Sequence, residues 1–297
     1  MWYNLNDILS YNCIYNFIVG MRGGGKTFAF KEKAIKNYLR DGSQFIYLRR
    51  YKTELYKINT FFEPDLIAKF PDHNFQTKGN RFYIDGQLAG YAIALSRSMI
   101  EKSNNYAKVT LIGFDEFILD TTSTYKYLNN EFDVFNNFYD TVDRNKDKTK
   151  VLFIGNAIST VNPYFTGLNI ALEPQRFTKV QVDGETLAVV EVWSDAAIKE
   201  KRSATRFGRL LAGTDYDRFS NDNTFYRDNV SFVIDIPWQD KPFHVFNVRW
   251  KGQDFSIWQE QKAYDIYISK QIKNNGAWVT PSPNEQTETI KWYDFKN

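Results

Sequence analysis

The sequence predicts an α/β fold built on a mostly parallel sheet, followed by a small β-rich unit. Residues 14–19, 44–48, 109–114 and 151–154 are short apolar runs that read as buried strands, and helical patterns separate several of them. Strands that alternate with helices favour parallel β-α-β units in one sheet. From about residue 223 the chain changes to a succession of short strand-like segments, which indicates a separate β-rich unit.

Length and composition limit the classes of protein that fit. The 297 residues, 43% of them hydrophobic, suffice for one large domain and a smaller one. The net charge of only +3 leaves no global basic field, so a nucleic-acid surface would have to be a local patch. The single cysteine, Cys13, excludes an internal disulfide and favours a cytosolic protein. No apolar run approaches membrane-spanning length and the polar start is not typical of a secretory signal, so we expect no membrane partner.

A glycine-rich stretch after the first strand carries the strongest motif. Residues 20–27 match G-x-x-x-x-G-K-[ST], the phosphate-binding loop (P-loop) of nucleotidases, and residues 27–39 read as the helix that should follow it. Backbone N–H groups of such a loop surround a triphosphate, while the lysine reaches the β- and γ-phosphates and the hydroxyl contacts Mg²⁺. The predicted ATP-binding residues are Gly20, Arg22, Gly23, Gly24, Gly25, Lys26 and Thr27, with Lys26 also catalytic and Thr27 also a Mg²⁺ ligand.

A second motif ends a later strand. Residues 109–114 run into the adjacent acids Asp115 and Glu116, which is the Walker B pattern. Asp115 is predicted to hold Mg²⁺ opposite Thr27, and Glu116 to polarise the water that attacks the γ-phosphate. Two acids at a strand end could also form a solvated terminus, but here they follow a complete P-loop. The pair favours ATP hydrolysis over a nucleotide kinase.

One further residue and one further segment are predicted to contact the nucleotide, but each could instead have a purely structural role. Asn156 follows the strand at 151–154, where P-loop ATPases with an additional strand place a γ-phosphate sensor, although an asparagine taken alone is more often a turn or cap residue. The segment 9–11 precedes the first strand and could pack either on the adenine or on the domain edge. The order of strands favours the sensor, and with it an additional-strand P-loop NTPase (ASCE) domain.

A basic helical segment at 196–211 separates two regimes of composition. We therefore divide the chain into a P-loop ATPase domain at 1–194, a basic helical linker at 195–222 and a β-rich C-terminal domain at 223–297. The strands expected in the C-terminal domain are 230–236, 242–250, 255–259 and 264–268.

Taken together, these stretches resemble the DNA-encapsidation ATPases of small protein-primed tailed phages, the motors that pump genomes into preformed heads. The resemblance runs from residue 9 to about residue 225 and is more specific than the Walker motifs alone. It is carried by residues 9–11, 20–27, 44–52, 70–73, 81–86, 101–104, 114–117, 140–142, 156–157, 161–165 and 205–210.

The resemblance implies a fold, partners and a location. It implies an additional-strand ATPase domain, a short linker and a C-terminal domain similar to a nuclease that has lost its catalytic acids. Subunits of the family form a ring, a pentamer, beneath the portal of the procapsid, with double-stranded viral DNA in the channel and, in some relatives, a structural packaging RNA. The expected location is the host cytoplasm, transiently on the procapsid. We expect no nuclease activity, because Asp235, Asp254 and Asp265 lack a metal-site signature.

The family also suggests residues for subunit cooperation and for DNA. Arg144, in a charged loop before the sensor strand, matches an arginine of the family and is predicted to complete a neighbour's site; Lys102 is the alternative. Any such charge taken alone is more often a solvated surface residue. The predicted DNA contacts are Lys52 and Lys126, followed by Arg49 and Arg50, either of which could instead serve the nucleotide site.

Two other functions compete with a DNA-translocating ATPase. A nucleotide-gated assembly switch would use the same Walker residues without a DNA track, and DNA would then leave its hydrolysis rate unchanged. A nucleoside kinase would need an acceptor pocket, for which the sequence offers no residues.

Overall fold

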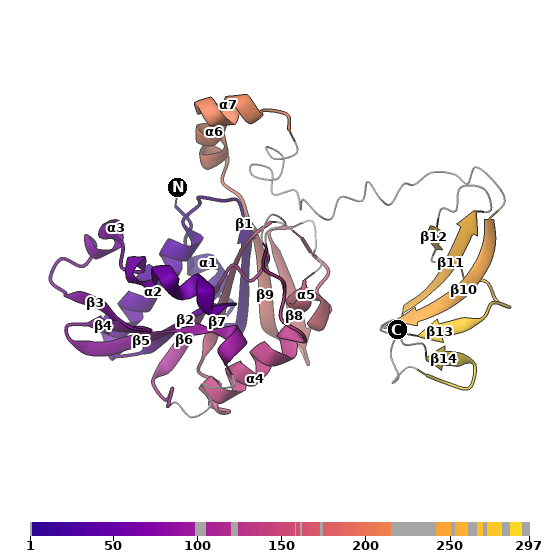
Figure 1. The fold of residues 1–297 in the computed structure, drawn as a ribbon, viewed down its shortest axis with the longest axis horizontal. Helices are drawn as coiled ribbons and strands as arrows, with labels where there is room; N and C mark the ends of the chain where they lie inside the picture. Colours follow the sequence, from indigo (N-terminus) through magenta and orange to yellow (C-terminus); the bar gives the residue numbers. More distant parts are fainter. Residues whose placement is uncertain are drawn as a thin grey trace. The chain divides into compact units, whose positions relative to one another are not determined.

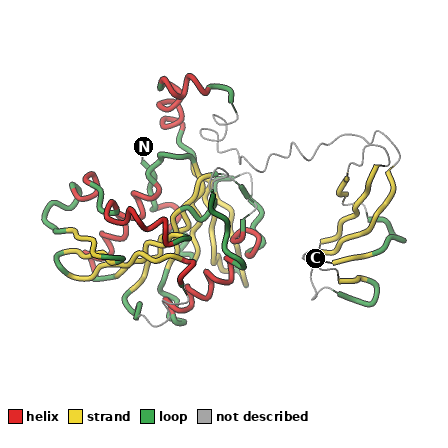
Figure 2. The backbone as a smooth tube through the Cα atoms, viewed as in Figure 1, coloured by secondary structure: helices red, strands yellow, loops and turns green. Residues whose placement is uncertain are grey.

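The chain forms two compact units, Met1–Asn229 and Val230–Asn297, each with a sheet of its own (Figures 1 and 2). The computed structural model describes residues 2–98, 105–119, 124–157, 159–160, 162–172, 175–214, 242–250, 253–260, 266–269, 272–280 and 286–292. Across these residues, no helix is both long enough and apolar enough to span a bilayer.

The described part of the first unit is built on a nine-stranded sheet with the order β3-β4-β5-β2-β6-β7-β1-β9-β8. Strands β5, β2, β6, β7, β1 and β9 run parallel, and antiparallel strands extend both edges. The strands are β1 (Tyr15–Gly20), β2 (Gln44–Arg49), β3 (Phe75–Lys78), β4 (Arg81–Ile84), β5 (Gln87–Ala94), β6 (Val109–Asp115), β7 (Lys150–Asn156), β8 (Phe177–Val182) and β9 (Glu185–Trp193). The predicted α/β fold with a large, mostly parallel sheet is confirmed.

Helices cover both faces of this sheet (Figure 1). Helix α2 contributes apolar residues to the core on one face, and α4 contributes to the core on the other. The described helices of the unit are α1 (Asn6–Leu9), α2 (Lys26–Asp41), α3 (Pro64–Ile67), α4 (Glu131–Asp143), α5 (Pro163–Gly167), α6 (Ala196–Ala204) and α7 (Arg206–Leu211), with 3₁₀ helices η1 (Lys52–Thr60) and η2 (Leu95–Arg97).

The central strands are apolar on both faces because both faces are covered. Along β1, Phe17 and Val19 enter the core beneath α4, whereas Ile18 enters the core beneath α2, as the alternation of side chains along a strand requires. Phe17 also stacks on Phe153 of β7, with ring centroids 4.3 Å apart. These contacts fix the register in which β1 and β7 end side by side, with Gly20 opposite Asn156.

The second unit contains a five-stranded sheet in its described part, with the order β12-β11-β10-β13-β14. Its strands are β10 (Pro242–Trp250), β11 (Gln253–Glu260), β12 (Ile266–Ser269), β13 (Trp278–Thr280) and β14 (Ile290–Trp292). The predicted strand at 230–236 lies outside the described residues, as do Asp235 and Asp265. Asp254 forms an ion pair with Arg249, 2.7 Å between Oδ1 and Nε, which gives this carboxylate a structural partner.

Candidate nucleotide-hydrolysis site

The glycine-rich loop joins the end of β1 to the start of α2, as the motif requires. Gly25 caps α2 with φ +84°, a left-handed conformation that favours glycine. Gly24 lies against the ring of Trp193 at the end of β9, so that a side chain at position 24 would collide with this ring. The loop is therefore held between the helix that it starts and the strand next to β1.

The lysine of the loop is buried inside it. Lys26 Nζ donates to the carbonyl oxygens of Gly20 and Met21, at 3.0 and 2.7 Å, and lies 3.4 Å from Asn156 Oδ1. Burial lowers the pKa of Lys26 to about 8, and the nearby Asp115 carboxylate opposes this shift. The structure thus places Asn156 beside the P-loop lysine, where a γ-phosphate sensor would have to lie.

Thr27 and Asp115 face each other across the pocket. Thr27 Oγ1 donates to Asp115 Oδ1 at 3.0 Å, and Tyr47 donates its hydroxyl to the other oxygen, Oδ2, also at 3.0 Å. One hydroxyl and one carboxylate are the hard oxygen ligands that suit Mg²⁺, which keeps several waters and shares substrate phosphates instead of filling a protein cage. Among the described residues, no group of three or more His, Cys, Asp or Glu side chains is arranged so that it could hold a metal ion.

The second Walker B acid is exposed and engaged by an arginine. Glu116 has a positive φ of +60°, and its side chain is 60% exposed. Arg49 Nη2 lies 2.7 Å from Glu116 Oε2, while Nη1 lies 3.3 Å from Asp115 Oδ2. Glu54 of η1 binds the same guanidinium at 2.9 Å. Arg49 therefore contacts both Walker B acids, as the alternative that the sequence left open for this residue requires.

Arg50 has to be reassigned from the DNA surface to the core. Its side chain is fully buried and forms an ion pair with buried Glu131 at the start of α4, with 2.8 Å between Nε and Oε2. The guanidinium also donates to the carbonyl oxygens of Glu116 and Phe117, at 3.0 and 2.7 Å. These bonds fix the backbone that carries the Walker B acids, and burial keeps a DNA phosphate out of reach of Arg50.

The other two predicted DNA contacts are exposed and lie on segments that touch each other. Lys52 starts η1 after β2, and Lys126 lies in the segment between β6 and α4. Their neighbours Tyr51 and Tyr125 stack with ring centroids 5.1 Å apart, and the Tyr51 hydroxyl donates to the Lys126 carbonyl oxygen at 2.9 Å. The two lysines therefore lie on adjoining exposed segments at the carboxyl ends of the strands.

Arg144 lies near the amino ends of the central strands, whereas the P-loop and the Walker B acids lie at the carboxyl ends. Helix α4 begins beside the Walker B strand end, where Glu131 pairs with Arg50, and ends at Asp143. The loop after α4 contacts the start of β6 instead, because Lys148 Nζ donates to the Ala107 carbonyl oxygen. Lys102, the alternative trans-acting residue, lies outside the described residues.

The P-loop, the Walker B acids and Asn156 border a pocket with a volume of about 370 Å³. It is lined by Trp2, Gly23, Gly24, Gly25, Lys26, Thr27, Phe28, Glu63, Asp115, Glu116, Ile154, Gly155 and Asn156. Trp2, Tyr47 and Glu54 were missed by the sequence reasoning; an isolated aromatic or acid carries no motif, and only the fold brings it to the P-loop. Of the segment 9–11, Leu9 and Tyr11 pack against the core, which favours the domain-edge alternative.

The site combines a P-loop, adjacent Walker B acids and a polar residue on the neighbouring strand, all at the carboxyl ends of parallel strands. This combination defines a P-loop ATPase of the kind that couples hydrolysis to work. Residues 1–280 match the family model described as podovirus DNA encapsidation protein (Gp16). The chain belongs to this family.

Individual relatives agree with this assignment. The DNA packaging protein of Bacillus phage phi29 is 40% identical over 297 residues, covering 99% of this chain and 87% of that protein. The DNA packaging protein of Bacillus phage B103 is 37% identical over 262 residues, covering 88% and 79%. Two solved structures from phi29 are also similar. The N-terminal domain of the DNA packaging ATPase has a TM-score of 0.60 and 43% identity, covering 66% of this chain and 97% of that one. A chain of the viral genome packaging motor assembly has a TM-score of 0.71 and 36% identity, covering 98% and 87%.

Proposed function

We propose that this chain is a viral genome-packaging ATPase that couples ATP hydrolysis to the translocation of double-stranded DNA into a preformed procapsid. The proposal rests on the proximity of the hydrolysis site to an exposed lysine, both at the carboxyl ends of the parallel strands. The hydrolysis site contains Lys26, Asp115 and Glu116, and Arg49 links it through Glu54 to η1, which starts with exposed Lys52. A motor has to transmit changes at its catalytic site to the surface that holds the DNA, and these contacts would provide that connection.

The chemistry assigned to the site follows from the side chains. Lys26 would move from its carbonyl acceptors to the β- and γ-phosphate oxygens, and Asn156 beside it would bind the γ-phosphate. Thr27 and Asp115 would hold Mg²⁺, which offsets the phosphate charge when it is bound. Glu116 would accept the proton of the attacking water. Arg49 binds Oε2 of the Glu116 carboxylate in this structure, so the other oxygen, Oε1, would accept the proton.

DNA contact is assigned to phosphates, because packaging has to tolerate every sequence. Lys52 and Lys126 supply exposed charge on segments that the tyrosine stack holds together. An ammonium group binds a phosphate as a point charge without reading a base, which suits a moving track.

The remaining features of the proposal concern the assembly. Subunits would form a ring, a pentamer as in the family, on the portal of the procapsid in the host cytoplasm, with a structural packaging RNA as a further candidate partner. The domain division at 1–194, 195–222 and 223–297 is part of this proposal. The C-terminal domain would be nuclease-like but inactive, and Arg144 would complete the neighbour's hydrolysis site.

The proposal is tested by the effect of duplex DNA on hydrolysis. We expect DNA to raise the ATPase rate of the full chain, and we expect Lys26→Ala, which lacks the phosphate contact, to show no activity with or without DNA. A rate that is substantial but independent of DNA would contradict the translocase and favour a nucleotide-gated assembly switch.

A further inference from the structure

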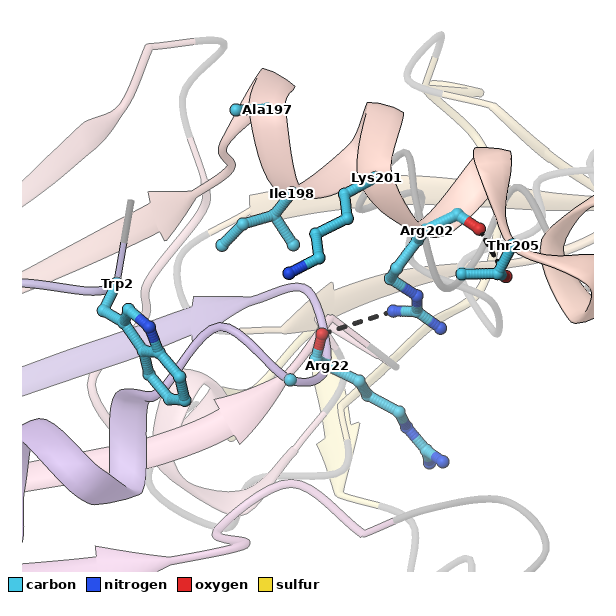
Figure 3. A pocket seen from close by; sticks show the side chains of 8 residues that line it. Trp2, Arg22, Ala197, Ile198, Lys201, Arg202 and Thr205 are labelled. Carbon is cyan, nitrogen blue, oxygen red and sulfur yellow. Dashed lines mark hydrogen bonds between the residues drawn. The ribbon is translucent and has the colours of Figure 1, made fainter. Parts of the chain in front are cut away.

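A second cavity adjoins the P-loop on the side away from the Walker B acids. It has a volume of about 540 Å³ and lies between the loop and helix α6 (Figure 3). Trp2, Arg22, Ile198, Lys201 and Arg202 are among its lining residues. Trp2 and Gly23 line both this cavity and the phosphate pocket, so the two spaces adjoin each other.

We propose that this cavity binds the adenosine part of the nucleotide, with the base stacked on Trp2 and covered by α6. The inference rests on the proposed ATPase function, because the phosphates in the P-loop would deliver the nucleoside to this place. The volume falls within the range of about 300–1,000 Å³ that is usual for small-molecule sites.

The position of Trp2 is the first argument. Its side chain is 70% exposed, although the indole ring lies directly against Gly25 of the P-loop. The next residue anchors this segment: Tyr3 donates its backbone N–H to the Gly24 carbonyl oxygen at 2.9 Å and its hydroxyl to buried Glu191 at 2.6 Å. A large, exposed aromatic ring is thus held beside the phosphate site, where a purine could bury it by stacking.

Helix α6 is the second argument. In Figure 3 the side chains of Ile198 and Lys201 project from α6 toward the cavity that Trp2 borders from the other side. Ile198 offers an apolar cover for a base, and the Lys201 ammonium can donate to ring nitrogens or ribose hydroxyls. Arg202 Nη1 donates to the Arg22 carbonyl oxygen at 3.2 Å, which fastens α6 to the P-loop. An apolar cavity with a few convergent donors is the composition that nucleoside sites require.

The consequence is a role for the segment that follows the sheet. Helix α6 begins three residues after β9 ends, so the base would contact the ATPase sheet and the basic helical segment at once. A bound adenosine would then add to the contacts that already join these elements, among them the hydrogen bond from Arg202 to the Arg22 carbonyl oxygen.

The test compares a ligand that carries the nucleoside with one that carries only the three linked phosphates. Equilibrium binding of Mg·ATP and of Mg·tripolyphosphate is measured on the full chain and on Trp2→Ala, Trp2→Phe and Ile198→Asp. We expect wild type to bind Mg·ATP more tightly than Mg·tripolyphosphate. Trp2→Ala should weaken Mg·ATP about 5- to 150-fold, the range that base–aromatic stacking supplies, and leave tripolyphosphate unchanged. Trp2→Phe should recover most of the loss. Ile198→Asp should weaken Mg·ATP more than Mg·tripolyphosphate, because its charge repels both ligands but only ATP loses the apolar cover.

Controls separate this subsite from the proposed function. Trp250→Ala removes an indole that is 46% exposed in the second unit, and it should alter neither affinity. Equal affinity of wild type for both ligands, unchanged Mg·ATP binding by Trp2→Ala, or an equal loss of both ligands would overturn the subsite while leaving the P-loop assignment intact. Failure of wild type to bind either ligand would instead contradict the ATPase function.

Discussion

Two consecutive arginines after β2 show how differently neighbouring residues can be used. Arg49 ends the strand and turns to the Walker B acids, whereas Arg50 turns inward to Glu131. Consecutive side chains of an extended chain point to opposite sides, so the two arginines reach different groups: Arg49 reaches the Glu116 carboxylate and Arg50 the Glu116 carbonyl oxygen. Arg49 therefore binds the carboxylates of the Walker B acids, and Arg50 fixes the backbone at Glu116 and Phe117.

Removal of Arg50 is expected to destabilise the first unit. Arg50→Met leaves the Glu131 carboxylate buried without its cation, and breaking one side of a buried ion pair typically costs about 3–5 kcal/mol. The measurement is denaturant unfolding of the variant and wild type. Lys52→Met, at a nearby exposed position, is the matched control and should change stability by less than about 0.5 kcal/mol. Equal stability of Arg50→Met and wild type would contradict the structural role of this pair.

Two substitutions at the hydrolysis site should have separable effects. Lys26→Ala removes the cation that reaches the phosphates, so both ATP binding and turnover should be lost. Glu116→Gln keeps the shape of the side chain but cannot accept a proton, so ATP should bind with turnover reduced by about 10²-fold or more. Nucleotide binding and steady-state hydrolysis are measured on the same preparations. Hydrolysis by Glu116→Gln near the wild-type rate would remove Glu116 from its catalytic assignment.

At the scale of elements, the important feature is the junction between η1 and the segment that leads into α4. The Tyr51–Tyr125 stack and the bond from Tyr51 to the Lys126 carbonyl oxygen join two segments far apart in the sequence. The η1 segment is also attached to the hydrolysis site through the Glu54–Arg49 pair. A change in how Arg49 binds the Walker B acids would therefore reach the surface that carries both lysines.

The paired substitution Lys52→Ala/Lys126→Ala is expected to weaken DNA binding alike for unrelated sequences. Removing two phosphate contacts should reduce the slope of log K against log salt by about 2, while basal ATP hydrolysis stays near wild type. Binding to two duplexes of unrelated sequence is measured over a salt series. Lys78→Ala, at an exposed site on β3, is the matched control and should leave the slope unchanged. Unaltered DNA affinity in the double variant would move the track elsewhere, with the basic segment at 199–209 as the next candidate.

The sequence alone was sufficient to predict those features whose chemistry requires a local pattern of residues. The P-loop and the Walker B strand could be predicted because glycine geometry, apolar strands and acids at a strand end each leave a local signal. The burial of Arg50 could not, because its partner Glu131 lies 81 residues away and an arginine after a strand looks exposed from sequence alone. The helix at α6 was predicted, but its position beside the P-loop was not, and neither was that of Trp2, because both depend on tertiary packing and on no motif.

For the whole molecule, the direction of α4 decides where a trans-acting residue can operate. With 13 residues, α4 spans about 20 Å from the Walker B end of the sheet to the opposite edge. Asp143 fixes the loop that follows, since its carboxylate accepts the backbone N–H groups of Lys146, Asp147, Lys148 and Thr149. Arg144 is therefore held in an ordered loop that cannot reach the P-loop of its own subunit.

If Arg144 completes a hydrolysis site, as the resemblance to the family implies, this geometry requires that the site belongs to a neighbouring subunit. Arg144→Ala should bind ATP normally, because its own P-loop is intact, and should hydrolyse it about 10³-fold more slowly if the arginine stabilises the transition state. A plain loss of rate would also fit a folding defect in the loop. Arg144→Lys is therefore measured in parallel, since it retains the charge but lacks the planar guanidinium, and it should recover little activity.

Mixing two inactive variants is the decisive measurement. An Arg144→Ala subunit has a sound Walker site, and a Glu116→Gln subunit has a sound arginine, so a mixed ring contains interfaces at which the second completes the site of the first. Activity should appear on mixing and rise with protein concentration, because the composite site exists only in the assembly. Neither variant should gain activity at the same total concentration alone. If mixed rings form and remain inactive, Arg144 has no role in trans, and Lys102 becomes the residue to test by the same complementation.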